Sequence, residues 1–373
     1  MALQRPSLQH RAAAATEPGV AGLAGGHGTP PRRGPRPDPS VTATPEQALE
    51  QAALAGIHRF AIPTPFAVGR VNCYLIEDEP LTLVDTGPNS GKALDELTAK
   101  LAERGHALAD LEQIVVTHQH IDHLGLVEIL VEHSGAEVAA LGAAARRLAA
   151  FEEDAELEDQ FAVEVMLRNG IPEDVTVALR SVSRSFRSWG SHVTVTKPLE
   201  DGGVLELGER RLEVLHRPGH SPSDTIFWDA ERRILIAADH LLPNISSNPL
   251  LARPLDGSSE RPQALATYIE SLKKTREMPA EIVLPGHGEP ITDHVALIDS
   301  RFAGSERRKE KIYRLIAERP RTGYELAQAL WGNVAVTQAY LTLSEVIGHT
   351  DLLVNGGRVR EVDDGAVIRY EAT

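Results

Sequence analysis

A short segment rich in histidine and aspartate is the part of this sequence best suited to metal chemistry. It reads T-H-Q-H-I-D-H over residues 117–123 and directly follows an apolar, strand-like run. Its side chains that can ligate a metal are His118, His120, Asp122 and His123. An extended strand that ends in a turn places His118 and His120 on one side, while the following turn presents the other two. Two groups on each side suit a pair of adjacent metal ions better than a single ion.

Three further candidate ligands each follow an apolar run elsewhere in the chain. His220 follows LEVLHRPG, Asp239 ends ILIAAD, and His287 ends EIVLPGH. Because α/β domains build sites where strand ends meet in one crevice, we expect these residues to join the cluster at 118–123. The single cysteine, Cys73, excludes a cysteine-rich zinc site. Imidazole and carboxylate ligands suit Zn²⁺, although Fe and Mn accept the same set.

The elements that must position these residues alternate along the chain. We expect strands at 71–76, 81–85, 113–118, 212–216, 234–239 and 281–287, and helices at 90–104, 124–134, 143–170 and 261–277. This alternation predicts a layered α/β domain whose sheets are covered by helices.

The chain is expected to have three parts. Residues 1–45 are rich in Ala, Gly, Pro and Arg without apolar periodicity, which predicts a disordered tail and leaves a targeting role open. Residues 46–302 form the α/β domain. Residues 303–373 read as three helices and a hairpin around an Asp-Gly turn, which is typical of a small winged-helix-like α+β domain. That domain is either a structural or dimer-forming appendage or a DNA-binding unit.

The charge of the chain disfavours nucleic acid as a partner. The net charge is −15, and residues 1–40 carry five arginines against two acids, which leaves −18 on the rest. Such a body repels phosphate backbones and anionic membrane surfaces. The third helix of the C-terminal part has no Lys or Arg between Val336 and Val354, so it is poorly suited to bind in a groove of DNA. No apolar run of 18 residues is present, so we expect no membrane span and a cytoplasmic protein.

Five motifs, taken in order, resemble those of the metallo-β-lactamase superfamily. They are LVDTG around Asp85, HQHIDH at 118–123, HRPGHS around His220, AADH around Asp239 and PGHG around His287. The resemblance covers roughly residues 55–300 and is strongest for the glyoxalase II-like or lactamase-like subgroup with a C-terminal winged-helix-like domain. It implies an αββα sandwich with two Zn²⁺ ions per chain at one edge.

The resemblance also assigns a role to each of the candidate ligands. The first metal site would consist of His118, His120 and His220. The second would consist of Asp122, His123 and His287. Asp239 would bridge the two ions, and Asp85 would lie behind them and orient a ligand histidine.

The implied activity is that of a metal-dependent hydrolase. Hydroxide held between the two metals would attack the carbonyl of a carboxylic ester, lactone or thioester. Asp122, His123 and Asp239 are the residues expected to take part in catalysis, with Asp122 able to hold the hydroxide's proton. Two alternatives remain open: an endoribonuclease of the lactamase-like subgroup, and a non-enzymatic transcription regulator that senses a ligand.

Two segments are expected to shape the substrate pocket. The uncharged loop at 241–252 predicts an apolar rim, with Asn244 and Asn248 as candidate substrate contacts. The region 143–200 is expected to form a helical cap whose apolar side chains wall the pocket, namely Phe151, Phe161, Met166, Leu167, Phe186 and Trp189. The expected partner is therefore a small-molecule substrate with an apolar part. The sequence leaves the substrate, the metal and a homodimer open.

Overall fold

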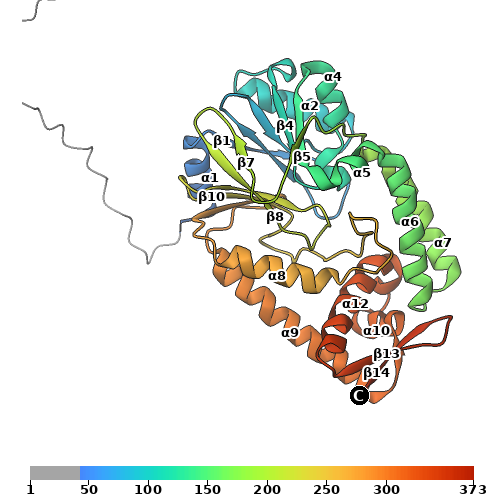
Figure 1. Ribbon diagram of the computed structural model, residues 1–373. Coiled ribbons are helices and arrows are strands. Elements are labelled where there is room, and N and C mark those ends of the chain that lie inside the picture. The colour runs from blue at the N-terminus through green and yellow to red at the C-terminus, as the bar shows by residue number, and fades with distance from the viewer. Residues whose placement is uncertain (1–42) are drawn as a thin grey trace, which may run out of the picture. The chain divides into compact units, whose positions relative to one another are not determined.

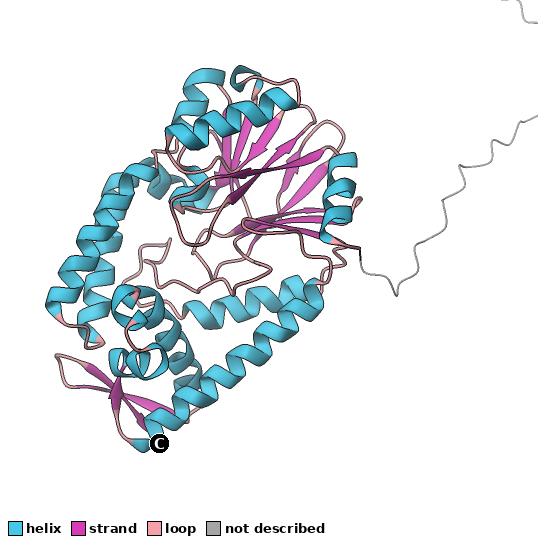
Figure 2. Cartoon of the chain, turned by 180° about the vertical axis from the view of Figure 1, so that it is seen from behind, coloured by secondary structure: helices cyan, strands magenta, loops and turns pink. Residues whose placement is uncertain are grey.

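Two β-sheets packed face to face form the centre of the molecule. The computed structural model describes residues 43–373, apart from the side chains of residues 335 and 337. Helices cover both outer faces of the paired sheets (Figure 1 and Figure 2). This αββα sandwich confirms the predicted fold class. Residues 1–42 of the tail predicted at 1–45 lie outside the described residues. Of the remaining three, Thr44 caps helix α1 (Pro45–Leu54) and Pro45 is its first residue.

The first sheet has six strands in the order β1-β2-β3-β4-β5-β6. Their bounds are Ile57–Ile62, Val71–Ile76, Thr82–Val84, Gln113–Val116, Glu137–Leu141 and Lys197–Leu199. Strands β3 to β6 pair in parallel, whereas β1 and β2 are antiparallel. Helices α2 (Gly91–Glu103) and α4 (Val127–Ser134) cover the outer face and bury leucines against it.

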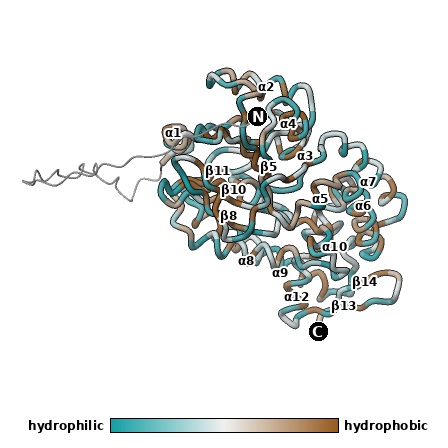
Figure 3. The backbone as a smooth tube through the Cα atoms, turned by 45° about the horizontal axis from the view of Figure 1, so that its top comes forward, coloured by the Kyte–Doolittle hydropathy of each residue, from teal (hydrophilic) through white to brown (hydrophobic). Residues whose placement is uncertain are grey.

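The second sheet has five strands in the order β11-β10-β9-β8-β7. In chain order, β7 to β11 span Val204–Glu206, Arg211–His216, Thr225–Asp229, Ile234–Ala238 and Ile282–Pro285. Helices α8 (Ala264–Arg276) and α9 (His294–Glu318) cover its outer face. Apolar side chains from the inner faces of both sheets, such as Tyr74 and Phe227, fill one shared core. Figure 3 shows this concentration of hydrophobic residues along β8, β10 and β11.

A helical arm connects the end of β5 to β6. It contains α5 (Ala145–Ala149), α6 (Phe151–Arg168) and α7 (Glu173–Phe186), and α6 packs along α7 beside the sandwich (Figure 1). The arm therefore supplies the helical cap expected between residues 143 and 200. Its α6 side chains also enter a core with the C-terminal part of the chain.

The C-terminal part consists of three helices and a small sheet. Its helices are α10 (Gly323–Trp331), α11 (Val334–Thr337) and α12 (Ala339–Asn355). Its strands β12 (Arg321–Thr322), β13 (Val359–Asp363) and β14 (Ile368–Ala372) pair in the order β12-β14-β13. The predicted hairpin is the β13–β14 pair, while the winged-helix likeness remains a prediction. The domain boundary predicted at 302/303 falls inside α9, which contributes to the core of the sandwich and to that of the C-terminal part.

No helix among the described residues is both long and apolar enough to cross a bilayer.

Candidate metal centre and adjoining cavity

The candidate ligands lie at one edge of the sandwich because the strands that precede them end there. Strands β3 and β4 are parallel, and so are β10 and β11, so the carboxyl ends of each pair meet at one edge. His118 lies two residues beyond β4, Asp239 directly follows β10, and His287 lies two residues beyond β11. His120 is the N-cap of α3 (Ile121–Leu124).

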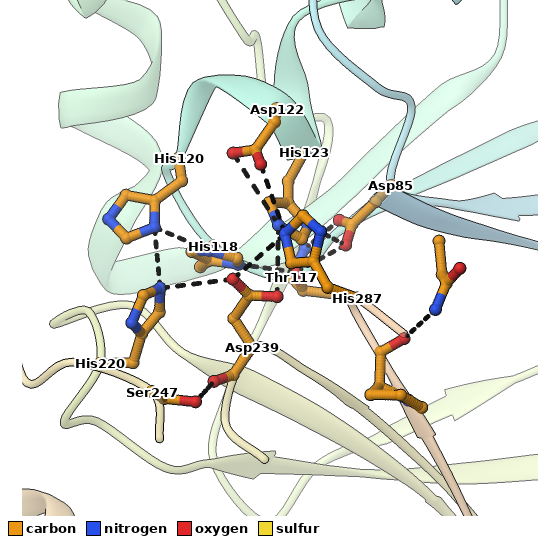
Figure 4. A network of polar contacts seen from close by, with 12 residues as sticks. Asp85, Thr117, His118, His120, Asp122, His123, His220, Asp239, Ser247 and His287 are labelled. Atoms are coloured by element: carbon orange, nitrogen blue, oxygen red, sulfur yellow. Dashed lines mark hydrogen bonds and ion pairs between the residues drawn. The ribbon is translucent and has the colours of Figure 1, made fainter. Parts of the chain in front are cut away.

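Seven side chains converge at this edge and form three overlapping groups, within each of which the ligand atoms lie within 4.8 Å of one another. The groups are His118, His120 and His220; Asp122, His123 and His287; and His118, His123 and Asp239. The first two have the same members as the two metal sites inferred from the sequence. The Asp239 carboxylate lies between them, with Oδ2 3.6 Å from His220 Nε2 and 3.5 Å from His287 Nε2 (Figure 4).

Asp85 lies behind the cluster and fixes the orientation of His123. Its Oδ2 accepts hydrogen bonds from His123 Nδ1 at 2.7 Å and from the Thr117 hydroxyl at 2.9 Å. The Thr117 amide donates to Oδ1 at 2.9 Å. Because Nδ1 of His123 is committed to this carboxylate, its Nε2 faces the cluster and is the ring atom available to a metal ion.

Three of the other four histidines in the cluster are anchored in the same way. The Thr117 hydroxyl donates to Asp85, so it accepts from His118 Nδ1 at 2.9 Å. His287 Nδ1 donates to the carbonyl of Arg70 at 2.8 Å, and His220 Nδ1 donates to the carbonyl of Asn248 at 3.0 Å. Each bond turns the opposite ring nitrogen inward, as metal-ligating histidines require.

The electrostatics of the cluster differ between its members. Burial opposes protonation of His123 and His287, but the neighbouring carboxylates, Asp239 first, outweigh it and raise the pKa of both, so that a bound metal ion would replace a proton on each. Burial lowers the pKa of His118, and it lowers that of His120 to about 3, so both imidazoles are neutral near pH 7. Burial opposes ionisation of Asp239, but His123 and His287 outweigh it and hold the pKa of this carboxyl well below its usual value. Neutral imidazole and ionised carboxylate are the forms that ligate a metal ion.

Two buried atoms of the cluster have no hydrogen-bond partner. They are His123 Nε2 and Asp239 Oδ1, which lie 3.5 Å apart. An unpaired buried polar atom costs free energy, and a cation bound by both atoms would remove that cost. The residues present therefore fit a metal ion.

The backbone that carries Asp239 is locally strained. Ala238 has a φ of +43°, and the pairing of β10 with β11 shifts register between Ile236 and Ala238. Such irregularities re-aim a side chain at the end of a strand and are common beside active sites. The Asp239 carbonyl also accepts from the Ser247 hydroxyl at 2.5 Å, which ties the loop after β10 to the cluster.

A cavity of about 600 Å³ opens onto the cluster. Among its lining residues are five of the seven candidate ligands: His120, Asp122, His220, Asp239 and His287. Its apolar walls come from distant parts of the chain and include Phe66, Ile121, Leu148, Phe151, Phe186, Leu242, Ile245, Leu250 and Leu341. The loop at 241–252 therefore lines the cavity together with the helical arm and α12.

The sequence-based expectations for the pocket are met unevenly. Asn248 lines the cavity, whereas Asn244 is exposed and is not among the lining residues. Phe151 and Phe186 line it as expected. In contrast, Phe161 belongs to a core with α12, together with Met166. The expectation that these two form the pocket wall was wrong because the C-terminal part covers that face of the arm.

Among the residues that the sequence analysis missed are one anchor, Thr117, and the lining residues Phe66 and Leu341. Thr117 directly precedes the histidine motif, and its hydroxyl at a strand end was a usable signal. Phe66 is an aromatic residue in a proline-containing loop, which is a weaker signal. Leu341 had none, because its place on the cavity depends on how the C-terminal helices pack.

Comparison with known proteins identifies a family of metal-dependent hydrolases. The model of the Metallo-beta-lactamase superfamily matches residues 67–287. The probable metallo-hydrolase YqjP of Bacillus subtilis is 35% identical over 294 residues, which cover 78% of this chain and 90% of that protein. The human acyl-coenzyme A thioesterase MBLAC2 is 29% identical over 188 residues, covering 46% of this chain and 58% of that protein.

A solved structure extends the similarity through the C-terminal part. The metallo-beta-lactamase family protein TTHA1429 from Thermus thermophilus superposes with a TM-score of 0.71 at 27% identity. The match covers 86% of this chain and 100% of that one.

Proposed function

Because the chain belongs to the metallo-beta-lactamase superfamily, we propose that it is a hydrolase with two metal ions that cleaves thioesters or esters with an apolar acyl group. One observation carries the proposal: seven inward-facing imidazole and carboxylate groups lie at one end of a largely apolar cavity. Relatives named as thioesterases support the thioester as the first substrate class to test.

We assign the ligands by the geometry of the groups. His118, His120 and His220 would hold one ion, and the other would be held by Asp122, His123 and His287. Asp239 would contact both ions, since its carboxylate lies between the groups. Imidazole and carboxylate ligands suit Zn²⁺, and Fe or Mn would fit the same ligands.

The chemistry divides between the bound ions and the chain. Two divalent cations lower the pKa of water and polarise a substrate carbonyl, which makes hydrolysis feasible near neutral pH. Asp122 contributes a carboxylate that lines the cavity and can hold a proton there. The buried Asp85 keeps His123 in the tautomer that faces the cluster.

The cavity wall favours an apolar acyl group. Val68, Phe186, Ile245 and Leu341 are large hydrophobic residues exposed to solvent by 37–50%, and all four line this cavity. Exposed apolar side chains gathered around one opening mark a binding site. An acyl chain that covers them gains about 0.8 kcal/mol for each methylene buried.

The charges of the cavity disfavour a polyanion such as RNA. Among the described residues that line it, the cations are Arg147 and Arg187. Arg147 pairs with Asp154 and Glu158, and Arg187 pairs with Glu156 and Asp159. A phosphate backbone would therefore meet guanidinium groups that are already paired with acids, and the cavity lining among the described residues offers no other Lys or Arg.

A substrate panel on metal-analysed protein tests the proposal. Acyl thioesters and p-nitrophenyl esters with chains of about 2 to 16 carbons should show kcat/KM rising with length until the cavity is filled. A lactone, a chromogenic β-lactam and RNA complete the panel. Cleavage of the β-lactam or RNA without turnover of any acyl substrate would contradict the proposal.

Two matched variants locate the acyl group. Ile245→Ala removes apolar surface from the mouth of the cavity and should lower kcat/KM for the longer acyl chains by about fivefold. Val177→Ala removes a similarly exposed aliphatic side chain on α7 that does not line the cavity, so activity should stay unchanged. Equal effects of the two variants on every chain length would argue against this site.

A further inference from the structure

The long loop between β10 and α8 is held in place by the C-terminal helix α12. The Tyr340 hydroxyl donates to the carbonyl of Leu251 at 2.5 Å, and the Leu251 amide donates to the Ser344 hydroxyl at 3.4 Å. Leu251 itself is buried in a core with α12 residues. The loop that lines the cavity therefore contacts a segment about 90 residues further along the chain.

Asn248 makes a second contact of this kind, and its orientation is fixed by hydrogen-bond chemistry. Its side-chain Nδ2 donates to the carbonyl of Leu341 at 3.0 Å. A carbonyl can only accept, so the amide nitrogen and not the amide oxygen must face Leu341. The side chain thus anchors this point of the loop to the first turn of α12.

The backbone of the same residue contacts the candidate metal centre. The Asn248 carbonyl accepts from His220 Nδ1 at 3.0 Å, which leaves His220 Nε2 2.9 Å from His120 Nδ1 and 3.6 Å from Asp239. A continuous chain of contacts therefore runs from Leu341 through Asn248 to His220.

The anchor of His220 differs from those of three other histidines in the cluster. His118 and His123 are anchored by Thr117 and Asp85 at strand ends of the first sheet, and His287 by a carbonyl directly before β2. His220 alone among these four is anchored by a residue of an irregular loop. Ser247 and Arg301 hold the part of this loop that precedes Asn248, and α12 contacts Asn248 itself and Leu251.

Resting on the proposed function, we propose that Asn248 is a positioning residue through which α12 fixes the orientation of His220 in the first metal site. The C-terminal part then belongs to the metal-binding machinery and is more than an appendage. Removing the Asn248 side chain leaves the carbonyl that His220 needs, but frees it to move. Loss of such an outer contact typically lowers metal affinity 10- to 100-fold.

The test compares two hydrogen bonds that connect α12 to the same loop. Asn248→Ala removes the contact that continues to His220, and Asn248→Leu removes the same donor while keeping the side-chain volume. Tyr340→Phe removes a contact between α12 and Leu251 that does not continue to His220. Full-length proteins are stripped with a chelator and titrated with Co²⁺, while affinity and the visible Co²⁺ spectrum are recorded for each site.

We expect both Asn248 variants to weaken one of the two Co²⁺ sites about tenfold or more and to change its spectrum. The other site should be retained, and Tyr340→Phe should stay within about twofold of wild type. Wild-type affinities and spectra in both Asn248 variants would overturn the inference, as would an equal loss in Tyr340→Phe. Wild-type protein that takes up no Co²⁺ would overturn the proposed function itself and this inference with it.

Discussion

Asp85 holds an unusual backbone conformation at the point where it supports the cluster. Its φ of +58° lies in the left-handed region that few residues other than Gly, Asn and Asp adopt. The side chain is buried, and its two oxygens accept three hydrogen bonds from Thr117 and His123. A strained backbone with a fully used carboxylate indicates a position set by the needs of the site.

The variant Asp85→Asn should weaken metal binding without disturbing the backbone. Asn tolerates the same φ, but its Nδ2 would face His123 Nδ1 if its oxygen keeps the bond to the Thr117 amide. His123 would then need the other tautomer, whose inward-facing nitrogen carries a proton and cannot ligate. We expect metal affinity to fall about 10- to 100-fold in a chelator competition assay.

The control for this variant is Asp110→Asn, the same change at an exposed position whose side chain only accepts from the Ala107 amide. It should retain wild-type affinity. If Asp85→Asn also retains wild-type metal affinity, the tautomer of His123 is not controlled by the Asp85 carboxylate.

At the scale of elements, the parallel pair β10–β11 brings two backbones close together beside the ligands. The Gly286 amide donates to the carbonyl of Ala238 at 2.7 Å. A Cβ on Gly286 would lie 2.1 Å from Asp239 Oδ1 and 3.0 Å from His123 Cε1. Only glycine fits between the end of β11 and the cluster.

The variant Gly286→Ala should therefore displace Asp239 and reduce the metal content of the purified protein well below that of wild type. The control is Gly91→Ala at the start of α2, where a Cβ would meet no atom within 4 Å and φ is not positive. Alanine there should leave metal content unchanged and the melting temperature equal or slightly higher. Full metal content in Gly286→Ala would show that Asp239 can shift without loss of the site.

The strands that carry the ligands could be predicted because they are buried throughout. Strands β4, β10 and β11 are buried at every residue and, apart from Gln113 at the start of β4, appear in the sequence as unbroken apolar runs. Strands β6 and β7 gave no such signal. β6 has three residues and contains Pro198, and β7 buries one residue of three. Pairing with neighbouring strands, which is not a local property, defines these short elements.

In the site, too, features that the local sequence shows could be predicted, whereas features set by tertiary packing could not. The candidate ligands could be singled out because His and Asp side chains follow several apolar runs, and because parallel strands bring the ends of those runs together. The cavity wall could not be assigned in full, since an aromatic residue on α6 faces either the cavity or the C-terminal part according to tertiary packing. Phe151 does the former and Phe161 the latter.

At the scale of the whole molecule, the C-terminal helix that would have to read DNA is enclosed by protein. Eleven of the 17 residues of α12 are buried, and the helix packs against α8, α9 and α10. A helix in this position cannot enter a DNA groove, and it carries no cation that would attract one. Its contact with Asn248 is the one through which we propose that it supports the hydrolase site instead.

We propose that seven side chains, which follow strands of both sheets, hold two metal ions on which hydrolysis depends. The most direct measurement is elemental analysis of wild type and His118→Ala, with turnover of an acyl thioester before and after chelation. The control is His133→Ala, which changes an exposed histidine of α4.

Wild type and His133→Ala should carry two ions per chain, lose turnover on chelation and regain it when metal is restored. His118→Ala should lose most of its metal and its activity. Two ions per chain with full turnover in His118→Ala would contradict the account.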